Sequence, residues 1–254
     1  MDVSLYGHLT FDRIFEDFRK YTAIGSIGNV WNFLLRINPK LKVNIEPTAI
    51  GEALVLVNKD KSERTSTAQL NLKTKKPNII DSKWNHIMYI NELDDVSFIK
   101  DIKGIVSADI CKGKELENKN ILRDIDYLFI SDEDIFTNIK ELGKLTKGWV
   151  ILHHKAGSIC TDGDKLFETK VSVIENVNVL GAGDMFAASF INEQLTTSVD
   201  LPNIVANSHH KVTIKIDATG KGSSEAKEAS KLNGGIEENL KKDRKVKLGV
   251  KIIR

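Results

Sequence analysis

The stretch that decides the fold is Asn178-Val179-Leu180-Gly181-Ala182-Gly183-Asp184-Met185-Phe186, in which a glycine-rich turn leads into a segment of helical spacing. Backbone N–H groups at a helix N-terminus are unpaired and the helix dipole is positive there, so this turn can hold an anion such as a transferring phosphoryl group. Asp184 would lie in the first helical turn. The alternative is that Asp184 only stabilises the helix start and that the glycines only make a tight turn. The residues from 181 to 184 leave both interpretations open, so the surrounding sequence has to separate them.

Short apolar runs alternate with longer segments of helical period elsewhere in the chain. This pattern is typical of an α/β fold, in which helices pack on the faces of a mostly parallel sheet. Trp84 and Tyr89 lie on or beside the first of these runs, and we expect both in the core rather than in a stacking platform. The runs predicted to be buried strands are residues 87–90, 104–107, 127–130 and 149–152.

Two stretches, at about 13–24 and 53–70, interrupt this rhythm and predict a small β flap that stands off the sheet. A flap of this kind could close over a ligand and exclude water. Its exposed surface is also where we would expect a homodimer to form. Its solvated tip is predicted to contain Lys59, Lys61, Glu63 and Arg64, with a substrate role for Arg64 as the alternative.

Composition restricts the classes of partner and the compartment. The 254 residues are 41% hydrophobic, which is enough for one substantial core, and the formal charge is only +2. A charge so close to zero gives no reason to expect a nucleic acid or membrane partner. No long apolar run is present, so we expect a cytoplasmic protein, and we expect Cys111 and Cys160 to be reduced and buried.

The composition changes at Asp217, after which aromatic residues stop and basic residues outnumber acidic ones. We therefore predict one α/β domain over residues 1–216 and a basic C-terminal tail of unknown role over residues 217–254. Residues 219–224 have the composition of a flexible linker.

The stretch from 178 to 186 resembles the D-T-x-G-A-G-D-x-F signature of the ribokinase-like carbohydrate kinases, the PfkB family. The resemblance implies a three-layer sandwich with a mostly parallel central sheet and a β lid, and makes residues 1–216 the kinase domain. It also implies that Asp184 is the base that takes the proton from the attacking hydroxyl. Gly181, Ala182 and Gly183 would form the anion hole for the phosphoryl group.

Two earlier segments resemble the sugar-binding motifs of that family in the expected order. Residues 7–12 are similar to a first strand that ends in a sugar-binding aspartate, here Asp12. Residues 24–29 are similar to G-G-x-x-x-N, which assigns Gly25 and Asn29 to the substrate. Taken singly, Asp12 could be a turn residue and Asn29 a solvent-facing polar residue; their order in the chain favours the substrate roles.

The nucleotide side is represented by weaker matches. Residues 126–134 resemble a strand that leads into N-x-x-E, with Ser131 and Asp134 in place of asparagine and glutamate. Of T-x-G-x-x-G only the general position and Gly157 fit. The resemblance implies ATP and Mg²⁺, with Mg²⁺ held through phosphates and water, no direct metal ligand assigned, and Asp134 as a candidate. The histidine pairs at 153–154 and 209–210 lack zinc-ligand spacing, so we expect surface or phosphate-proximal histidines.

Two departures from the family pattern concern the substrate and a cation. Ile24 replaces the first glycine of the sugar motif, which would reshape the backbone approach to the substrate. Asn178 replaces the aspartate that opens the signature, and a neutral amide is a weaker cation ligand than a carboxylate, so we expect activation by a monovalent cation to be lost.

The sequence as a whole predicts an ATP-dependent kinase that phosphorylates a hydroxyl of a sugar, a sugar-like small molecule or a nucleoside. The alternative is a catalytically weakened sugar-binding or regulatory protein of the same fold, which the altered nucleotide segment favours. Titration with ATP separates the two.

Overall fold

The computed structural model describes residues 1–58, 60–61, 63–73, 76–111, 116–132 and 138–220 of the chain. Asp134 and the tail after residue 220 lie outside these ranges. The last described helix continues to Gly220, four residues past the predicted domain boundary and into the predicted linker.

The described strands form a single ten-stranded sheet in the order β10-β9-β8-β7-β6-β5-β1-β3-β4, with β2 paired to β1. The six strands from β8 to β3 in this order run parallel, as predicted, whereas β9, β10, β2 and β4 are antiparallel to their neighbours. The bounds are β1 (Val3–Glu16), β2 (Arg19–Ser26), β3 (Val43–Asn58), β4 (Glu63–Lys73), β5 (Trp84–Ile87), β6 (Ile105–Asp109), β7 (Tyr127–Ser131), β8 (Trp149–His154), β9 (Gly157–Thr161) and β10 (Leu166–Lys170).

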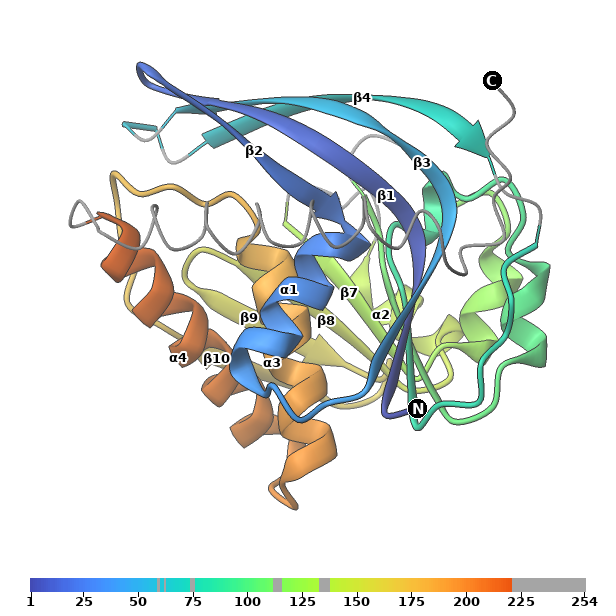
Figure 1. Cartoon of the computed structure of the whole chain (residues 1–254). Helices are drawn as coiled ribbons and strands as arrows, with labels where there is room; N and C mark the ends of the chain where they lie inside the picture. The colour runs from blue at the N-terminus through green and yellow to red at the C-terminus, as the bar shows by residue number, and fades with distance from the viewer. Residues whose placement is uncertain (59, 62, 74–75, 112–115, 133–137, 221–254) are drawn as a thin grey trace.

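Helices cover both faces of the parallel part of the sheet, which gives the predicted three layers (Figure 1). One face packs on α1 (Ile27–Ile37), α3 (Ala182–Thr196) and α4 (Leu201–Gly220) around a core that includes Trp84 and Phe129. The opposite face packs on short helices around Tyr6 and Phe98. These are the 3-10 helices η1 (Ile90–Glu92), η2 (Ser97–Asp101) and η3 (Lys119–Asp124) and the helix α2 (Ile139–Leu145).

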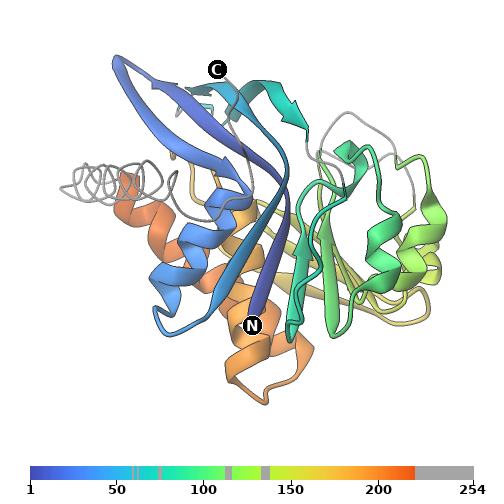
Figure 2. The same ribbon diagram turned by 45° about the vertical axis from the view of Figure 1, so that its right-hand side comes forward.

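The lid is an extension of the sheet and not a separate flap. The strands β1 and β3 pair in parallel along their whole length, with a bulge between Gly7 and His8. Their first halves belong to the central sheet, and their second halves leave it with β2 and β4 to form the lid (Figures 1 and 2). In this distal half, buried and exposed residues alternate, as expected when only one face is covered. The prediction placed the lid correctly but missed its continuity.

One predicted strand is displaced. The first buried run forms a strand at 84–87 and not at 87–90, because the chain turns at Tyr89, whose φ of 55° lies in the left-handed region. Trp84 is fully buried in the core, as expected. Tyr89 is only partly buried: it packs against the edge of this core, in part as expected, and also lines the cavity below the lid.

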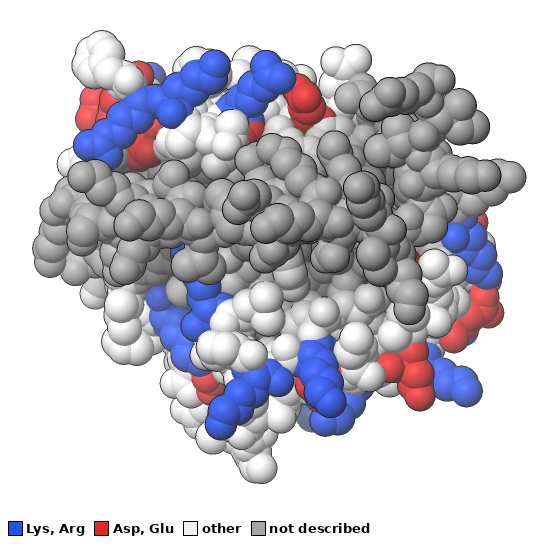
Figure 3. All heavy atoms as spheres, in the orientation of Figure 1, with Lys and Arg blue, Asp and Glu red and all other residues white. Residues whose placement is uncertain are grey.

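Charges of both signs are interspersed over the coloured part of the face in Figure 3. The described helices include none that is long and apolar enough to cross a membrane.

The outer face of the lid exposes apolar side chains, among them Phe15, Leu54 and Leu56. This is the surface of the predicted homodimer, which stays a prediction.

Candidate active site

The glycine turn lies at the N-terminus of α3, as the sequence predicted. Gly181 precedes the helix with φ 74° and ψ 13°, a conformation that favours glycine because it has no Cβ. The N–H group of Ala182 donates to the carbonyl of Val179 at 3.0 Å, and Ala182 does not line the cavity. The N–H groups of Gly183 and Asp184 follow at the helix start. The anion-hole role of this turn stays a prediction, carried by Gly181, Gly183 and Asp184 more than by Ala182.

Asp184 is buried, with 7% of its surface exposed, yet lines the cavity. Its Oδ2 accepts a hydrogen bond of 2.7 Å from Nδ2 of Asn29, a residue of α1. The packing of α1 against α3 therefore brings together two predicted site residues that are 155 positions apart. Asn29 lines the cavity and also orients the candidate base, and its predicted role in substrate binding stays a prediction.

Asp12 lies in β1 on the lid side of the same cavity and is 7% exposed. Its Oδ1 accepts a hydrogen bond of 2.7 Å from Thr10. Burial raises the pKa of Asp12, and the Thr10 hydrogen bond and the charge of Arg64 act against that rise. Gly25 stands behind this carboxylate: a Cβ at Gly25 would lie 2.3 Å from both Asp12 oxygens. Gly25 therefore makes room for Asp12 and does not itself line the cavity.

Ile24, the departure in the sugar motif, does not line the cavity. It is 6% exposed and belongs to the core below α1. A Cβ at Gly28 would lie 1.9 Å from Cγ2 of Ile24, so the isoleucine fills the space over Gly28. The expected reshaping of the backbone approach therefore corresponds to core packing, and not to a side chain in the substrate cavity.

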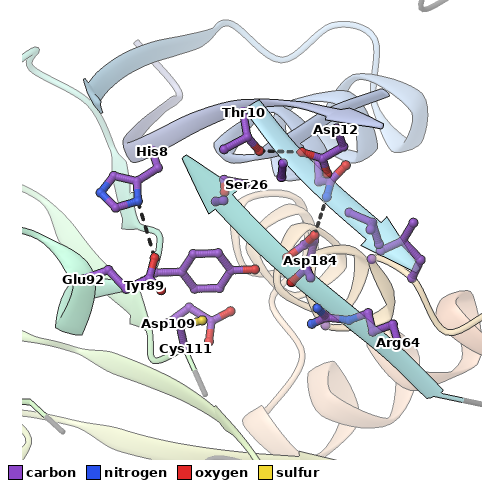
Figure 4. A pocket seen from close by; sticks show the side chains of 18 of the residues that line it. His8, Thr10, Asp12, Ser26, Arg64, Tyr89, Glu92, Asp109, Cys111 and Asp184 are labelled. Atoms are coloured by element: carbon purple, nitrogen blue, oxygen red, sulfur yellow. Dashed lines mark hydrogen bonds and ion pairs between the residues drawn. The ribbon is translucent and has the colours of Figure 1, made fainter. Parts of the chain in front are cut away.

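The cavity has a volume of about 410 Å³ and lies between the lid and the carboxyl ends of β6, β7 and β8 (Figure 4). In an α/β sheet this edge is where ligands commonly bind. Four carboxyl groups and one arginine line it, together with polar residues such as His8, whose Nδ1 lies 3.4 Å from Oε2 of Glu92. The ionisable groups named are Asp12, Glu92, Asp109, Asp184 and Arg64.

Two further residues line the cavity: Arg64, for which a substrate role was the alternative interpretation, and Tyr89, which the sequence did not connect with the site. Figure 4 shows Arg64 reaching from β4 toward Asp184; Arg64 is exposed, as expected, and it also lines the cavity, which favours the alternative of a substrate role. Tyr89 faces the same space from the turn after β5, and burial and then the charge of Asp184 raise its pKa well above the ordinary value. No local motif marks either residue, because a lid strand and a left-handed turn bring them to the site.

Of the residues predicted to bind the nucleotide, the structure places one in the cavity and one outside it. Ser131, at the end of β7, lines the cavity. Gly157 lies outside the cavity. Close packing requires glycine there: its φ is 143°, and a Cβ would lie 1.8 Å from the carbonyl oxygen of Thr169 in β10. Asp134 is outside the described residues.

His153 lies beside the glycine turn, with its Cε1 3.3 Å from where a Cβ on Gly183 would stand. Burial lowers the pKa of His153 to about 4, helped by the charges of His154 and Arg64. The ring of Phe186 contacts two histidine rings. Its centroid lies 5.6 Å from that of His153 in β8 and 4.7 Å from that of His209 in α4. His153 is therefore a neutral histidine beside the glycine turn, and its proximity to a bound phosphate stays a prediction. His209 instead belongs to the interior, with Nε2 2.5 Å from Oγ of Ser158.

Neither cysteine takes part in a disulfide bond, as expected, but only Cys160 is buried. Cys111 is half-buried and lines the cavity. Its backbone N–H donates to Asn91 at 2.8 Å, which fixes this wall of the cavity.

No family model matches the sequence, and no curated protein matches it. Solved structures do match. Ribokinase from Thermotoga maritima is 15% identical, with a TM-score of 0.64 over 89% of this chain and 95% of that one. Adenosine kinase from Sinorhizobium meliloti is 15% identical, with a TM-score of 0.64 over 85% and 94%. A pyrophosphate-dependent kinase in the ribokinase family, complexed with sulfate, is 14% identical, with a TM-score of 0.63 over 85% and 95%.

Identities this low show the fold alone. The described strand order, the lid and these similarities together agree with the signature at 178–186. The chain therefore has the ribokinase-like fold.

Proposed function

We propose that this protein is a kinase that transfers the γ-phosphoryl group of ATP to a hydroxyl of a sugar or sugar-like small molecule. The observation that carries the proposal is the carboxylate of Asp184, buried at the N-terminus of α3, hydrogen-bonded by Asn29 and facing the same cavity as Asp12. A binding protein has no need of a positioned base at an anion-binding helix end.

In the proposed reaction the acceptor hydroxyl oxygen attacks the γ-phosphorus, and the bond from that phosphorus to the leaving ADP oxygen breaks. The hydroxyl proton passes to Asp184 as general base. The hydrogen bond from Asn29 holds that carboxylate in place before the reaction begins. Backbone N–H groups at the helix start stabilise the charge on the transferring group, since they are fixed before the reaction and need no reorganisation.

The acceptor would be held from the lid side. Asp12 accepts hydrogen bonds from sugar hydroxyls, while Thr10 fixes the orientation of its carboxylate. Arg64, which reaches the cavity from β4, adds the positive charge that an incoming phosphoryl group requires. We expect Mg²⁺ to arrive with ATP and to be held through phosphates and water, with Asp134 as an additional candidate.

The test is a panel of sugars, sugar alcohols and nucleosides incubated with ATP or pyrophosphate, with detection of the phosphorylated product by mass spectrometry. Pyrophosphate is included because one similar structure is a pyrophosphate-dependent kinase. The proposal requires product with at least one acceptor and with ATP as donor. Product with pyrophosphate alone would retain the kinase and overturn the assignment of ATP.

The Asp184→Asn variant tests the role of the base. We expect turnover to fall by about 10²–10⁴-fold, because general-base assistance is lost, while acceptor binding by calorimetry stays within a few fold. The control is Asp162→Asn, the same change at a carboxylate in the loop between β9 and β10. There Oδ1 of Asp162 accepts a hydrogen bond from the backbone N–H of Lys165. Full turnover in Asp184→Asn would remove Asp184 from the mechanism.

A second candidate, a sugar-binding or regulatory protein of the same fold, is favoured by the position of Gly157 outside the cavity. This function predicts that the protein binds an acceptor but shows no calorimetric signal with millimolar ATP. ATP binding together with product formation would exclude it.

A further inference from the structure

The turn that carries the anion hole is attached to the lid by a chain of side-chain hydrogen bonds. Asn178 Nδ2 donates to Oε1 of Glu16 at 3.1 Å, and Glu16 lies at the end of β1 in the lid. The hydroxyl of Tyr21, in β2, donates to the other oxygen of Glu16 at 3.1 Å. On the turn side, Oδ1 of Asn178 accepts from the N–H of Leu180 at 2.8 Å.

An apolar contact runs parallel to this chain. Leu180, which precedes Gly181, packs against a lid cluster of Ile14, Ala53, Val55 and Val57. These four side chains are 2% to 9% exposed, so the lid holds the turn through a dry contact as well as a polar one. The polar connection ends on Asn178 and the apolar one on Leu180, which lie three positions and one position before Gly181, the positive-φ glycine of the anion hole.

The amide of residue 178 suits this arrangement better than the carboxylate that opens the family signature. Glu16 is 7% exposed, and a second carboxylate 3.1 Å away would repel it, whereas an amide nitrogen donates to it. The amide oxygen is used by Leu180 N–H, and the amide nitrogen faces Glu16. Both polar atoms of the Asn178 side chain are thus used within the protein, and the expected loss of activation by a monovalent cation stays a prediction.

We propose that Asn178 is a positioning residue that couples the lid to the anion hole. Glu16 in the lid holds Asn178, and Asn178 holds the turn at Leu180 and Gly181 in the shape that presents the α3 N-terminus to the cavity. When the lid lifts, the turn loses its support, so the anion hole is complete only over a covered substrate. The proposal rests on the proposed kinase function for its meaning in catalysis, but the coupling itself is measurable without catalysis.

The first measurement is hydrogen–deuterium exchange of the backbone, read by mass spectrometry in the segments 13–26 and 178–186. Asn178→Asp places two carboxylates together, so we expect faster exchange in both segments. In Asn178→Asp with Glu16→Gln, the amide and carboxylate have exchanged places and the hydrogen bond can form again. We expect this double variant to restore slow exchange in both segments.

The second measurement is turnover, once an acceptor is known. We expect kcat to fall by about tenfold in Asn178→Asp, the size typical of an unpaired buried polar group, and to recover to within about threefold in the double variant. A residue that only stabilised the fold would not be rescued by the exchange of polarity. Glu52→Gln is the matched control, because it makes the same change in an exposed lid pair with Arg13 and should alter neither readout.

Tyr21→Phe provides a milder test in case Asn178→Asp fails to fold. This variant removes the hydroxyl that donates to Glu16, at the lid end of the series of hydrogen bonds. We expect faster hydrogen exchange in the segment 178–186, although residue 21 lies in the lid. Exchange that changes in only one segment, or a double variant that is not rescued, would overturn the coupling. Coupling without any phosphorylated product would instead overturn the proposed kinase function and leave the coupling intact.

Discussion

Single atoms decide how the acceptor side of the site is built. Thr10 and Gly25 are register partners in β1 and β2, and both lie against the carboxylate of Asp12. The hydroxyl of Thr10 donates to that carboxylate, and the missing side chain at Gly25 leaves space for it. The glycine of the sugar motif is thus explained by a side chain of this protein, without reference to a ligand.

We expect Gly25→Ala to raise the KM for the acceptor by about tenfold or more while kcat changes less. A Cβ 2.3 Å from two oxygens must displace the carboxylate, which costs a charge-assisted contact to the acceptor. Steady-state kinetics of Gly25→Ala, Asp12→Asn and the double variant check this. Because both changes act on one group, their effects should not add; additive effects would contradict the account.

Elements decide which residues reach the cavity from the lid. Arg64 is on β4, at the outer edge of the sheet, and it enters the site because β3 carries β4 over the carboxyl ends of the parallel strands. Its charge acts on the pKa of Asp12 in β1, of Tyr89 in the turn after β5 and of His153 in β8. A lid in this position therefore contributes charge as well as cover.

We expect Arg64→Gln to lower kcat by about 10- to 100-fold, since the transferring phosphoryl group would lose a nearby positive charge. Arg64→Lys should recover only part of the loss, because an ammonium lacks the planar fork of arginine. Arg13→Gln is the control, an exposed lid arginine paired with Glu52. Equal effects of Arg13→Gln and Arg64→Gln would indicate a general loosening of the lid.

At the scale of the whole molecule, burial in the fold keeps the side chains of His86, His153 and His209 uncharged. Burial lowers the pKa of His86 to about 3 and those of His153 and His209 to about 4. Between these values and the ordinary value of about 6.5 the unfolded chain binds more protons than the folded one. The free energy of unfolding should therefore fall as the pH drops from about 6.5 toward 4. Asp12, with its raised pKa, opposes this trend as a single group.

Urea denaturation at pH 7, 6 and 5 checks this prediction. Each histidine contributes at most about 1.4 kcal/mol per pH unit in that window. His209→Asn should flatten the dependence, whereas His210→Asn should not, because His210 is the exposed neighbour on the same helix. Stability that rises on acidification would contradict the burial of these imidazoles.

The sequence by itself determined the α/β class, the parallel strands after residue 100 and the glycine turn at the start of α3. These follow from local patterns: buried strands are short apolar runs, and a turn into a helix needs glycine at a left-handed position. Asp12 and Asn29 were predicted for the same reason, since each lies in a short motif in the expected order.

Only the tertiary structure decided that Asn29 holds Asp184, that Arg64 and Tyr89 line the cavity, and that Gly157 serves sheet packing. It also connected Asn178 to Glu16, 162 positions away. Such pairings depend on strand order and on how far β1 and β3 extend beyond the sheet. Local sequence patterns encode which residues form an element, but the distance between two side chains on different elements is set by packing of the whole chain.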